Sequence, residues 1–193
     1  MKKTNTLENT NRLKKSNTFE KTNTLEKSDK FQILEEMLSE KEGQCVIWCT
    51  QLVTVDYLRT LLSTNYKVYV FTGALSHKQR ETVVENFRGD KEGIFLATIQ
   101  SAAEGLNLQT CNMMIFYEFS MVASVNEQAE GRCYRIGQKN NVLIYYLYAP
   151  GTIEEAILKM VRNKKDFNEF ISENKKLTKD QINYLINNMN LKI

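Results

Sequence analysis

Short apolar runs alternate with amphipathic segments along most of the chain. Five runs are rich in β-branched and aromatic residues, and the stretches between them have the apolar spacing of helices. The runs lie at residues 45–49, 66–71, 94–97, 113–117 and 142–148; the helical stretches lie at 28–43, 52–62, 76–87, 125–135, 152–170 and 178–190. Continuous apolar strands alternating with helices predict an α/β fold, in which a parallel sheet is sandwiched by helices.

Candidate capping residues mark the starts of three of these helices. Ser28 precedes the first helix, Ser76 and Gln79 form a capping-box signature, and Thr152 and Glu155 form another. In parallel α/β folds, functional loops follow the carboxyl ends of the strands. The loops between each predicted strand and the next helix are therefore the first places to look for a site.

A hexapeptide repeat lies near the start of the chain. Residues 4–27 read TNTLEN, TNRLKK, SNTFEK and TNTLEK, with one apolar side chain in each copy. Such a composition buries too little surface to offset the entropy of ordering the chain. We expect residues 1–28 to be a low-complexity disordered tail, with a weakly basic arm that touches nucleic acid as the alternative. Residues 29–165 would then be the folded domain, and 166–193 a helical extension.

The basic excess of the chain lies in that tail. The whole chain has 26 Lys and Arg against 23 Asp and Glu, whereas its first thirty residues hold eight against four. The rest of the chain is close to neutral, at 18 against 19. A domain that coats nucleic acid by bulk electrostatics carries a clear positive excess, so that class is excluded for the body of this chain.

Composition also excludes membrane and disulfide-rich classes. No apolar stretch approaches the roughly 18 residues of a membrane-spanning helix, and the charged N-terminus lacks the apolar segment of a secretory signal. Cys45 and Cys49 lie within an apolar run, and with Cys111 and Cys133 they read as small core hydrophobes of a reducing compartment. We expect no membrane association, no metal site and an intracellular location, cytoplasmic or nuclear.

Two arginines near residue 130 are the leading candidates for chemistry. In QAEGRCYRIGQ at residues 128–138, Arg132 and Arg135 would share one face of the predicted helix, with Gly131 inside the same turn. Close like charges and an interior glycine both destabilise a helix, which indicates a closely bound anion. A guanidinium grips phosphate oxygens bidentately and can act as an arginine finger in phosphoryl transfer. A solvated pair of surface arginines is the alternative.

A run of small residues follows the third predicted strand. The sequence TIQSAAEGLNL at residues 98–108 contains Ser101 and Gly105 among several residues that let a ligand approach the backbone closely. Backbone N–H groups of such a loop can hold a phosphate. Composition alone is equally consistent with an ordinary turn between a strand and a helix.

Five segments resemble, in order and spacing, the motifs of superfamily-two helicases. They are VIWCTQ at 46–51 (motif IV), FTG at 71–73 with QR at 79–80, AAEGLNL at 102–108 (motif V), QAEGRCYRIGQ at 128–138 (motif VI) and GTIEE at 151–155. The form RIGQ is that of the SWI/SNF-type ATPases. The resemblance covers about residues 29–165 and implies a RecA-like fold, the C-terminal lobe of an ATP-dependent translocase.

The resemblance implies an ATP-binding role for the residues of motifs V and VI. Arg132 and Arg135 would be the arginine fingers, reaching ATP and Mg²⁺ that are bound mainly by another lobe. The remaining residues implied to lie near ATP are Gly105, Asn107, Gln128 and Gly131.

The resemblance also implies a nucleic-acid side. The partner would be nucleic acid, with duplex DNA favoured by the family, gripped through its phosphate backbone. The residues implied to face it are Thr50, Gln51, Gly73, Thr98 and Ser101.

Four positions depart from the family's pattern. Ala103 and Glu104 stand where motif V commonly has a glycine and an apolar residue, which puts the backbone detail of that loop in question. Tyr134 stands where a His usually precedes the second arginine, and Gly131 follows the wider superfamily rather than the Asp common in SWI/SNF proteins.

The motifs of the first lobe are missing from this sequence. Such a motor also carries GxxxxGK[ST] and a DExH-type box, whereas this chain contains no Gly-Lys pair and no DExH or DExD. We therefore expect the chain to be the second lobe, to hydrolyse no ATP by itself and to need a separate chain that carries the first lobe. The alternatives are a non-catalytic DNA- or protein-binding module and a decayed helicase fragment.

Overall fold

Five parallel strands form the centre of the computed structural model, which describes residues 28–134, 141–163, 178 and 180. Their order across the sheet is β2-β3-β1-β4-β5, with every neighbouring pair parallel. The strands are β1 (Cys45–Cys49), β2 (Val68–Phe71), β3 (Ile94–Thr98), β4 (Met113–Phe116) and β5 (Leu143–Tyr146). This confirms the predicted α/β fold with a parallel sheet.

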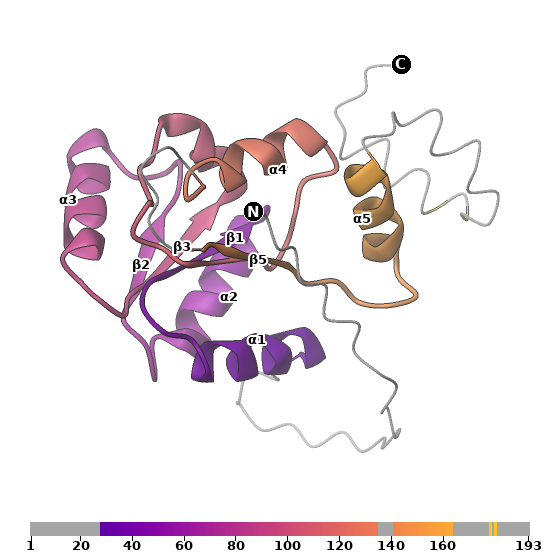
Figure 1. Cartoon of the computed structure of the whole chain (residues 1–193), viewed down its shortest axis with the longest axis horizontal. Helices are drawn as coiled ribbons and strands as arrows, with labels where there is room; N and C mark the ends of the chain where they lie inside the picture. The colour runs from indigo at the N-terminus through magenta and orange to yellow at the C-terminus, as the bar shows by residue number, and fades with distance from the viewer. Residues whose placement is uncertain (1–27, 135–140, 164–177, 179, 181–193) are drawn as a thin grey trace.

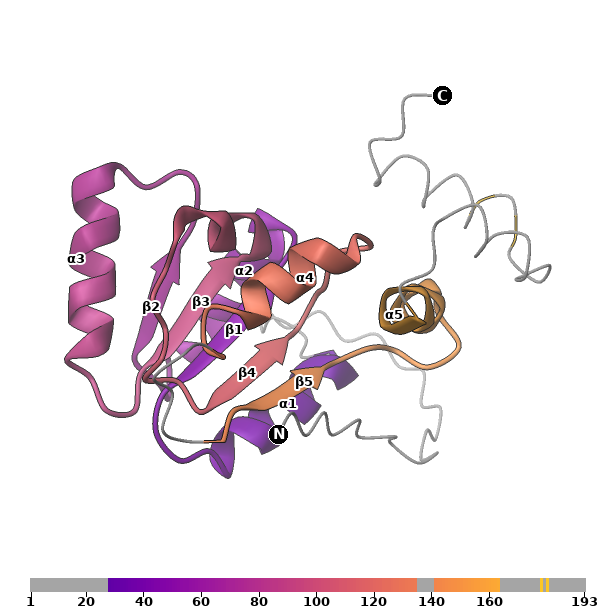
Figure 2. The same cartoon turned by 45° about the horizontal axis from the view of Figure 1, so that its top comes forward.

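Helices cover both faces of the sheet (Figures 1 and 2). One face carries α1 (Asp29–Ser39) and α2 (Leu52–Leu62), and the other carries α3 (His77–Arg88), the 3₁₀ helix η1 (Ile99–Glu104) and α4 (Ala123–Glu130). The last described helix, α5 (Ile153–Asn163), lies beyond β5 and packs its buried residues against Phe119 and Met121 of the loop after β4. The chain therefore forms three layers with α5 at one edge.

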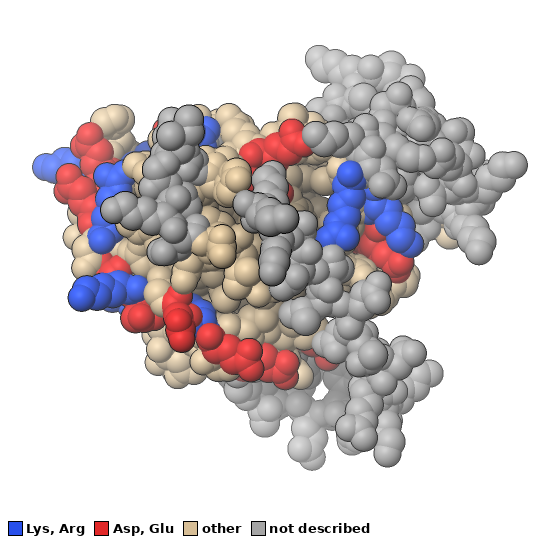
Figure 3. Space-filling view, in the orientation of Figure 1, with Lys and Arg blue, Asp and Glu red and all other residues tan. Residues whose placement is uncertain are grey.

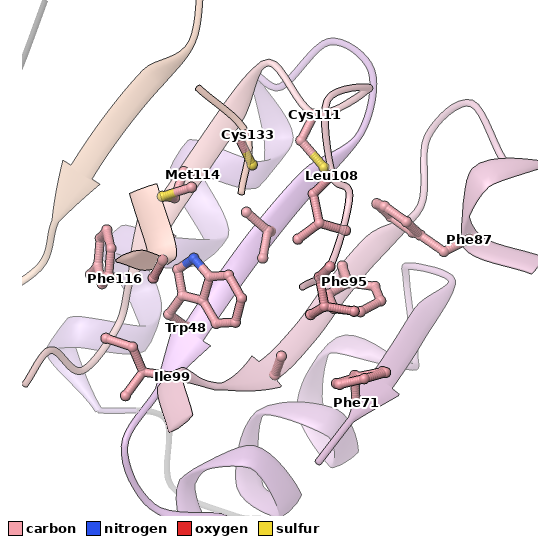
Figure 4. Packing of buried hydrophobic residues seen from close by; sticks show 14 of the residues in the cluster. Trp48, Phe71, Phe87, Phe95, Ile99, Leu108, Cys111, Met114, Phe116 and Cys133 are labelled. Carbon is pink, nitrogen blue, oxygen red and sulfur yellow. The ribbon is translucent and has the colours of Figure 1, made fainter. Parts of the chain in front are cut away.

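The two central strands explain the uninterrupted apolar runs in the sequence. All five residues of β1 and all five of β3 are buried, because each strand packs against helices on both faces. Alternate side chains of β1 enter different clusters: Trp48 lies with Phe95 under α3 and α4, whereas Ile47 lies with the side chains of α1 and α2. Figure 4 shows the first of these clusters around Trp48. The core therefore extends through both sides of the sheet.

The predicted caps at the starts of α1 and α3 are confirmed. The Ser28 hydroxyl accepts the N–H of Phe31. Ser76 and Gln79 form a reciprocal capping box, in which each side chain accepts the other residue's backbone N–H. Each bond satisfies a backbone N–H that has no partner within its helix.

Replacing Ser76 with Ala is expected to lower the free energy of unfolding by about 1 kcal/mol, because the N–H of Gln79 loses its acceptor. Urea denaturation followed by Trp48 fluorescence measures the change. Thr82→Ala is the matched control, since the Thr82 hydroxyl bonds only to the Lys78 carbonyl within α3 and caps no helix end. An equal loss of stability in both variants would contradict a capping role for Ser76.

The helix predicted over residues 125–135 is wrong at its C-terminal end. The helix α4 ends at Glu130, Gly131 is its C-cap, and Arg132 follows in a turn. The N–H groups of Arg132 and Cys133 bond to carbonyls three residues back, which tightens the chain out of the α-helix. Gly131 is therefore not inside a helix, and Arg132 lies beyond the end of α4; Arg135, with which it was predicted to share a helix face, lies outside the described residues.

Smaller differences occur at other boundaries. β2 begins at Val68 rather than at Tyr66, and β5 covers Leu143–Tyr146 rather than 142–148. The sequence also did not indicate η1, which follows β3 without a break. The tail up to residue 27 and the helix predicted at 178–190, apart from residues 178 and 180, lie outside the described residues, as does the part of the 152–170 helix beyond 163.

Candidate functional site

The carboxyl ends of the five strands meet at one edge of the sheet, because all the strands are parallel. Cys49 of β1 is paired with Thr98 of β3, and Trp48 with Phe116 of β4, so the loops after these three strands are neighbours. The chain after β1 continues to α2 on one face, whereas the chains after β3 and β4 continue on the other. Loops that diverge in this way open a crevice of the kind in which α/β folds bind ligands.

The loop after η1 and the turn after α4 lie against each other, beside the chain that enters β4. η1 ends at Gly105, whose φ of 75° lies in the left-handed region that favours glycine. Three residues later the N–H of Leu108 donates to the carbonyl of Arg132 at 3.1 Å. The structure thus brings Leu108, the residue after Asn107, against Arg132.

Arg132 is partly buried in the turn after α4, whereas the sequence predicted it on the surface of a helix. Its Nε atom is buried and has no hydrogen-bond partner within the described residues. Gln128 is exposed on the last turn of α4, and Gly131 follows three residues after it as the C-cap. A buried guanidinium nitrogen without an acceptor is a donor that an anionic ligand can satisfy.

The end of α4 is fixed by a tyrosine of the neighbouring strand. The Tyr146 hydroxyl donates to Oε1 of Glu130, the last residue of α4, at 3.0 Å, and its ring stacks on Phe116 with centroids 4.3 Å apart. Burial, and then the negative charge of Glu130, raise the pKa of Tyr146, so the hydroxyl stays protonated and keeps donating. This contact holds the position from which the chain enters the Arg132 turn.

A cavity of about 340 Å³ lies between α3 and the loop after η1. Gly105 and Asn107 line it on one side, and Arg80 and Arg88 of α3 line it on the other. Arg80 and Arg88 were not predicted as site residues. Only the tertiary packing of α3 beside this loop brings them there.

Thr50 and Gln51 lie at the end of β1, where a carboxylate already holds them. Oε2 of Glu118 accepts the N–H of Thr50 at 2.8 Å, the Thr50 hydroxyl at 3.0 Å and the N–H of Gln51 at 3.0 Å. Oε1 accepts the Thr54 hydroxyl at 2.6 Å. Glu118 follows β4 and lies 68 positions from Thr50, so nothing in the sequence indicated this contact. Its charge also complements the positive N-terminal end of α2.

The other three residues predicted on the nucleic-acid side differ in exposure. Gly73 is exposed after β2. Thr98 and Ser101 are almost fully buried, at 6% and 3% exposure, and the Ser101 hydroxyl donates to the Thr98 carbonyl at 2.5 Å. All three lie at the carboxyl edge of the sheet, but the bond from the Ser101 hydroxyl to the Thr98 carbonyl supports the turn into η1 from inside.

The GTIEE segment anchors α5 to the domain. One oxygen of Glu154 accepts the N–H of Ala149 at 2.8 Å, and the other pairs with Lys30 of α1 at 2.8 Å. Glu155 accepts the N–H of Gly151 at 3.0 Å. These contacts close the bend between β5 and α5 and give the segment a structural role beside the site.

On the face seen in Figure 3, charge is mixed rather than gathered in one basic patch. Figure 3 shows Lys and Arg beside Asp and Glu over α3, and acidic side chains along α1. All four cysteines are buried, which confirms that they are core residues, and burial raises the pKa of the Cys45 thiol. Within the described ranges, no group of three or more His, Cys, Asp or Glu could hold a metal ion, and no helix is long and apolar enough to span a membrane.

The parallel five-stranded sheet covered by helices on both faces is matched by a comparison with protein families. Residues 29–137 match the family model described as the helicase conserved C-terminal domain. The match covers more than half of the chain, so the chain belongs to the helicase C-terminal domain family.

Individual relatives narrow the class to SWI/SNF-type helicases. Helicase ssl-1 of Caenorhabditis elegans is 33% identical over 145 residues, 72% of this chain and 6% of that protein. The Xenopus tropicalis protein described as SWI/SNF-related matrix-associated actin-dependent regulator of chromatin subfamily A containing DEAD/H box 1 is 32% identical over 140 residues, 70% of this chain and 14% of that protein. The chain thus spans a small part of the length of these relatives.

A solved structure confirms the RecA-like fold. The crystal structure of the C-terminal part of the Fun30 ATPase domain is similar with a TM-score of 0.65 and 28% sequence identity, over 75% of this chain and 49% of that chain. This chain is therefore the C-terminal RecA-like domain of a SWI/SNF-type helicase.

Proposed function

We propose that this domain completes the ATP site of a DNA translocase whose first RecA-like lobe is supplied by a separate chain. Arg132 and Arg135 would act as arginine fingers on the terminal phosphate of ATP. Gly105, Asn107, Gln128 and Gly131 would lie at the interface between the lobes. Bound ATP with Mg²⁺ supplies the phosphoryl group, and the arginines stabilise the negative charge that develops on it.

The hydrogen bond between the N–H of Leu108 and the carbonyl of Arg132 is the observation that carries this proposal. It joins the loop and the turn whose residues are proposed to meet ATP, although 24 positions separate them in sequence. The buried Nε of Arg132, without a partner in the described part of the chain, supports the finger role. Buried donors are usually satisfied, so this nitrogen is open to an acceptor on a ligand, although Nε of Arg80 is also buried without a partner among the described residues.

The proposed nucleic-acid contacts lie at the carboxyl edge of the sheet. The proposed location of the protein is intracellular, in the cytoplasm or the nucleus. The exposed Gln51 side chain and the exposed Gly73 would contact the phosphate backbone of duplex DNA. Thr50, Thr98 and Ser101 would act from inside by fixing the loops that present these contacts. Closure and opening of the two lobes on ATP would then move the contacts along the DNA.

The purified full chain alone is expected to show no ATP turnover, with or without a DNA duplex, because it lacks the phosphate-binding motif of the first lobe. Mixing it with a chain that carries GxxxxGK[ST] and DExH from a SWI/SNF-type motor is expected to produce ATPase activity that DNA stimulates. A coupled ATPase assay measures both. Turnover by the chain alone after stringent purification, or none in the mixture, would contradict the proposal.

A non-catalytic binding module is the second candidate. It is favoured by the Glu118 carboxylate, which occupies the backbone N–H groups of Thr50 and Gln51 and so removes two donors that an ATP-driven grip on a phosphate backbone would use. In that case the chain would bind a DNA duplex or a protein without any effect of ATP. Titration with a labelled duplex, with and without Mg–ATP and the first-lobe chain, separates the two candidates.

A further inference from the structure

Arg80 of α3 connects two loops that the proposed function treats separately. Its Nη1 pairs with Oε2 of Glu104, the last residue of η1, and its Nη2 donates to the carbonyl of Gly73 at 2.9 Å. Gly73 belongs to the proposed nucleic-acid side, and Glu104 immediately precedes Gly105 on the ATP side. Both side chains of the ion pair are less than one-third exposed, so solvent weakens the pair only in part.

A second arginine of α3 holds the other end of the same loop. Arg88 lies two helical turns after Arg80, so both side chains project from one side of α3. Nη2 of Arg88 donates to the carbonyl of Asn107 at 3.4 Å. The loop from Glu104 to Asn107 is therefore held at both ends by α3, with the left-handed Gly105 between the two contacts.

Glu104 is one of the residues at which this chain departs from its family. An apolar residue, which is common at that position, has no charge with which to hold Arg80. The carboxylate fits the guanidinium, whose geometry favours charged oxygen acceptors. Glu104, the residue that departs from the motif, is thus paired with Arg80 in the structure.

We propose that Arg80 and Arg88 are positioning residues that hold the loop from Glu104 to Asn107 in the conformation that meets ATP. Glu104 is the anchor for Arg80. Through its bond to Gly73, Arg80 also links the turn proposed to contact DNA with the loop proposed to contact ATP. The effect of this arrangement on ATP turnover rests on the proposed function. The contacts of Arg80 and Arg88 with the loop from Glu104 to Asn107, called the brace below, can be tested on the chain alone.

Hydrogen–deuterium exchange of the full chain tests the brace. Arg80→Ala and Glu104→Gln are each expected to speed exchange of the peptide covering residues 104–111, which contains the bonded N–H of Leu108, by about fivefold. Exchange of the core strand Cys45–Cys49 should stay unchanged. The charge swap that combines Arg80→Glu with Glu104→Arg should restore slow exchange, because it restores the ion pair. Arg59→Ala is the matched control, since Arg59 pairs with exposed Asp56 on α2, away from this loop.

Unchanged exchange at residues 104–111, or an equal increase in the Arg59→Ala variant, would overturn the brace. So would a charge swap that fails to rescue either single variant. In the two-chain ATPase assay, Arg80→Ala should lower the ratio of DNA-stimulated to basal turnover about threefold or more; an unchanged ratio would overturn the link to Gly73. If the two-chain mixture has no ATPase, the proposed function fails, while the exchange result still decides the brace.

Discussion

Replacing Arg132 with Ala is expected to lower kcat of the two-chain, DNA-stimulated ATPase by about a thousandfold, the usual size of an arginine-finger effect. Arg132 is held beside the Gly105–Asn107 loop by a backbone hydrogen bond that does not involve its side chain. Truncation should therefore remove the guanidinium and leave the loop in place. Steady-state kinetics at saturating ATP measures the loss.

Two companion variants separate a finger from a general loss of positive charge. Arg132→Lys keeps the charge but cannot contact two phosphate oxygens with a planar fork, so it should recover only a small part of kcat. Arg59→Ala removes an equal charge from the exposed surface of α2 and should leave kcat within about twofold. Full activity of Arg132→Ala would show that the finger assignment is wrong.

Replacing Glu118 with Ala is expected to lower the free energy of unfolding by about 3 kcal/mol. The carboxylate accepts four hydrogen bonds from Thr50, Gln51 and Thr54, and these donors lose their common acceptor. α2 has no side-chain cap of its own, since its N-cap Gln51 makes no such bond. The start of the helix therefore depends on an acceptor from the loop after β4. Urea denaturation with Trp48 fluorescence measures the change.

Matched substitutions show whether the carboxylate itself matters. Glu118→Gln keeps one oxygen acceptor and should lose about half as much stability as Glu118→Ala. Glu36→Gln removes the same charge from an exposed position of α1 and should change stability by less than about 0.5 kcal/mol. If Glu118→Ala proves as stable as Glu36→Gln, Glu118 does not hold the start of α2.

Local signals in the sequence predicted the elements of the fold well. Each apolar run became a strand, because a strand buried on both faces has no room for polar side chains. Ser28 and Ser76 were correctly identified as caps, since a cap bonds to backbone only three residues away. Where the prediction was wrong, as at the end of α4, the glycine that ends the helix had been read as part of it.

The site was predictable only in part. The motifs pointed to Gly105, Asn107 and Arg132, and the structure joins the loop that holds the first two to the turn of Arg132 by the bond from the N–H of Leu108. Pairs such as Glu118 with Thr50 and Arg80 with Glu104 could not be found, because no local pattern links residues 68 and 24 positions apart. The grouping of the remaining predicted residues into a working ATP or DNA site stays a prediction.

The sequence by itself determined the kinds of element in this protein, their order and the family to which they belong. Those properties follow from hydrophobic period, capping residues and motif spacing, all of which act over a few residues. Only the tertiary structure decided which loops meet, because parallel pairing brings the ends of β1, β3 and β4 to one edge. That pairing sets Glu118 on the start of α2, whereas the packing of α4 on the sheet sets Arg132 beside the loop after η1.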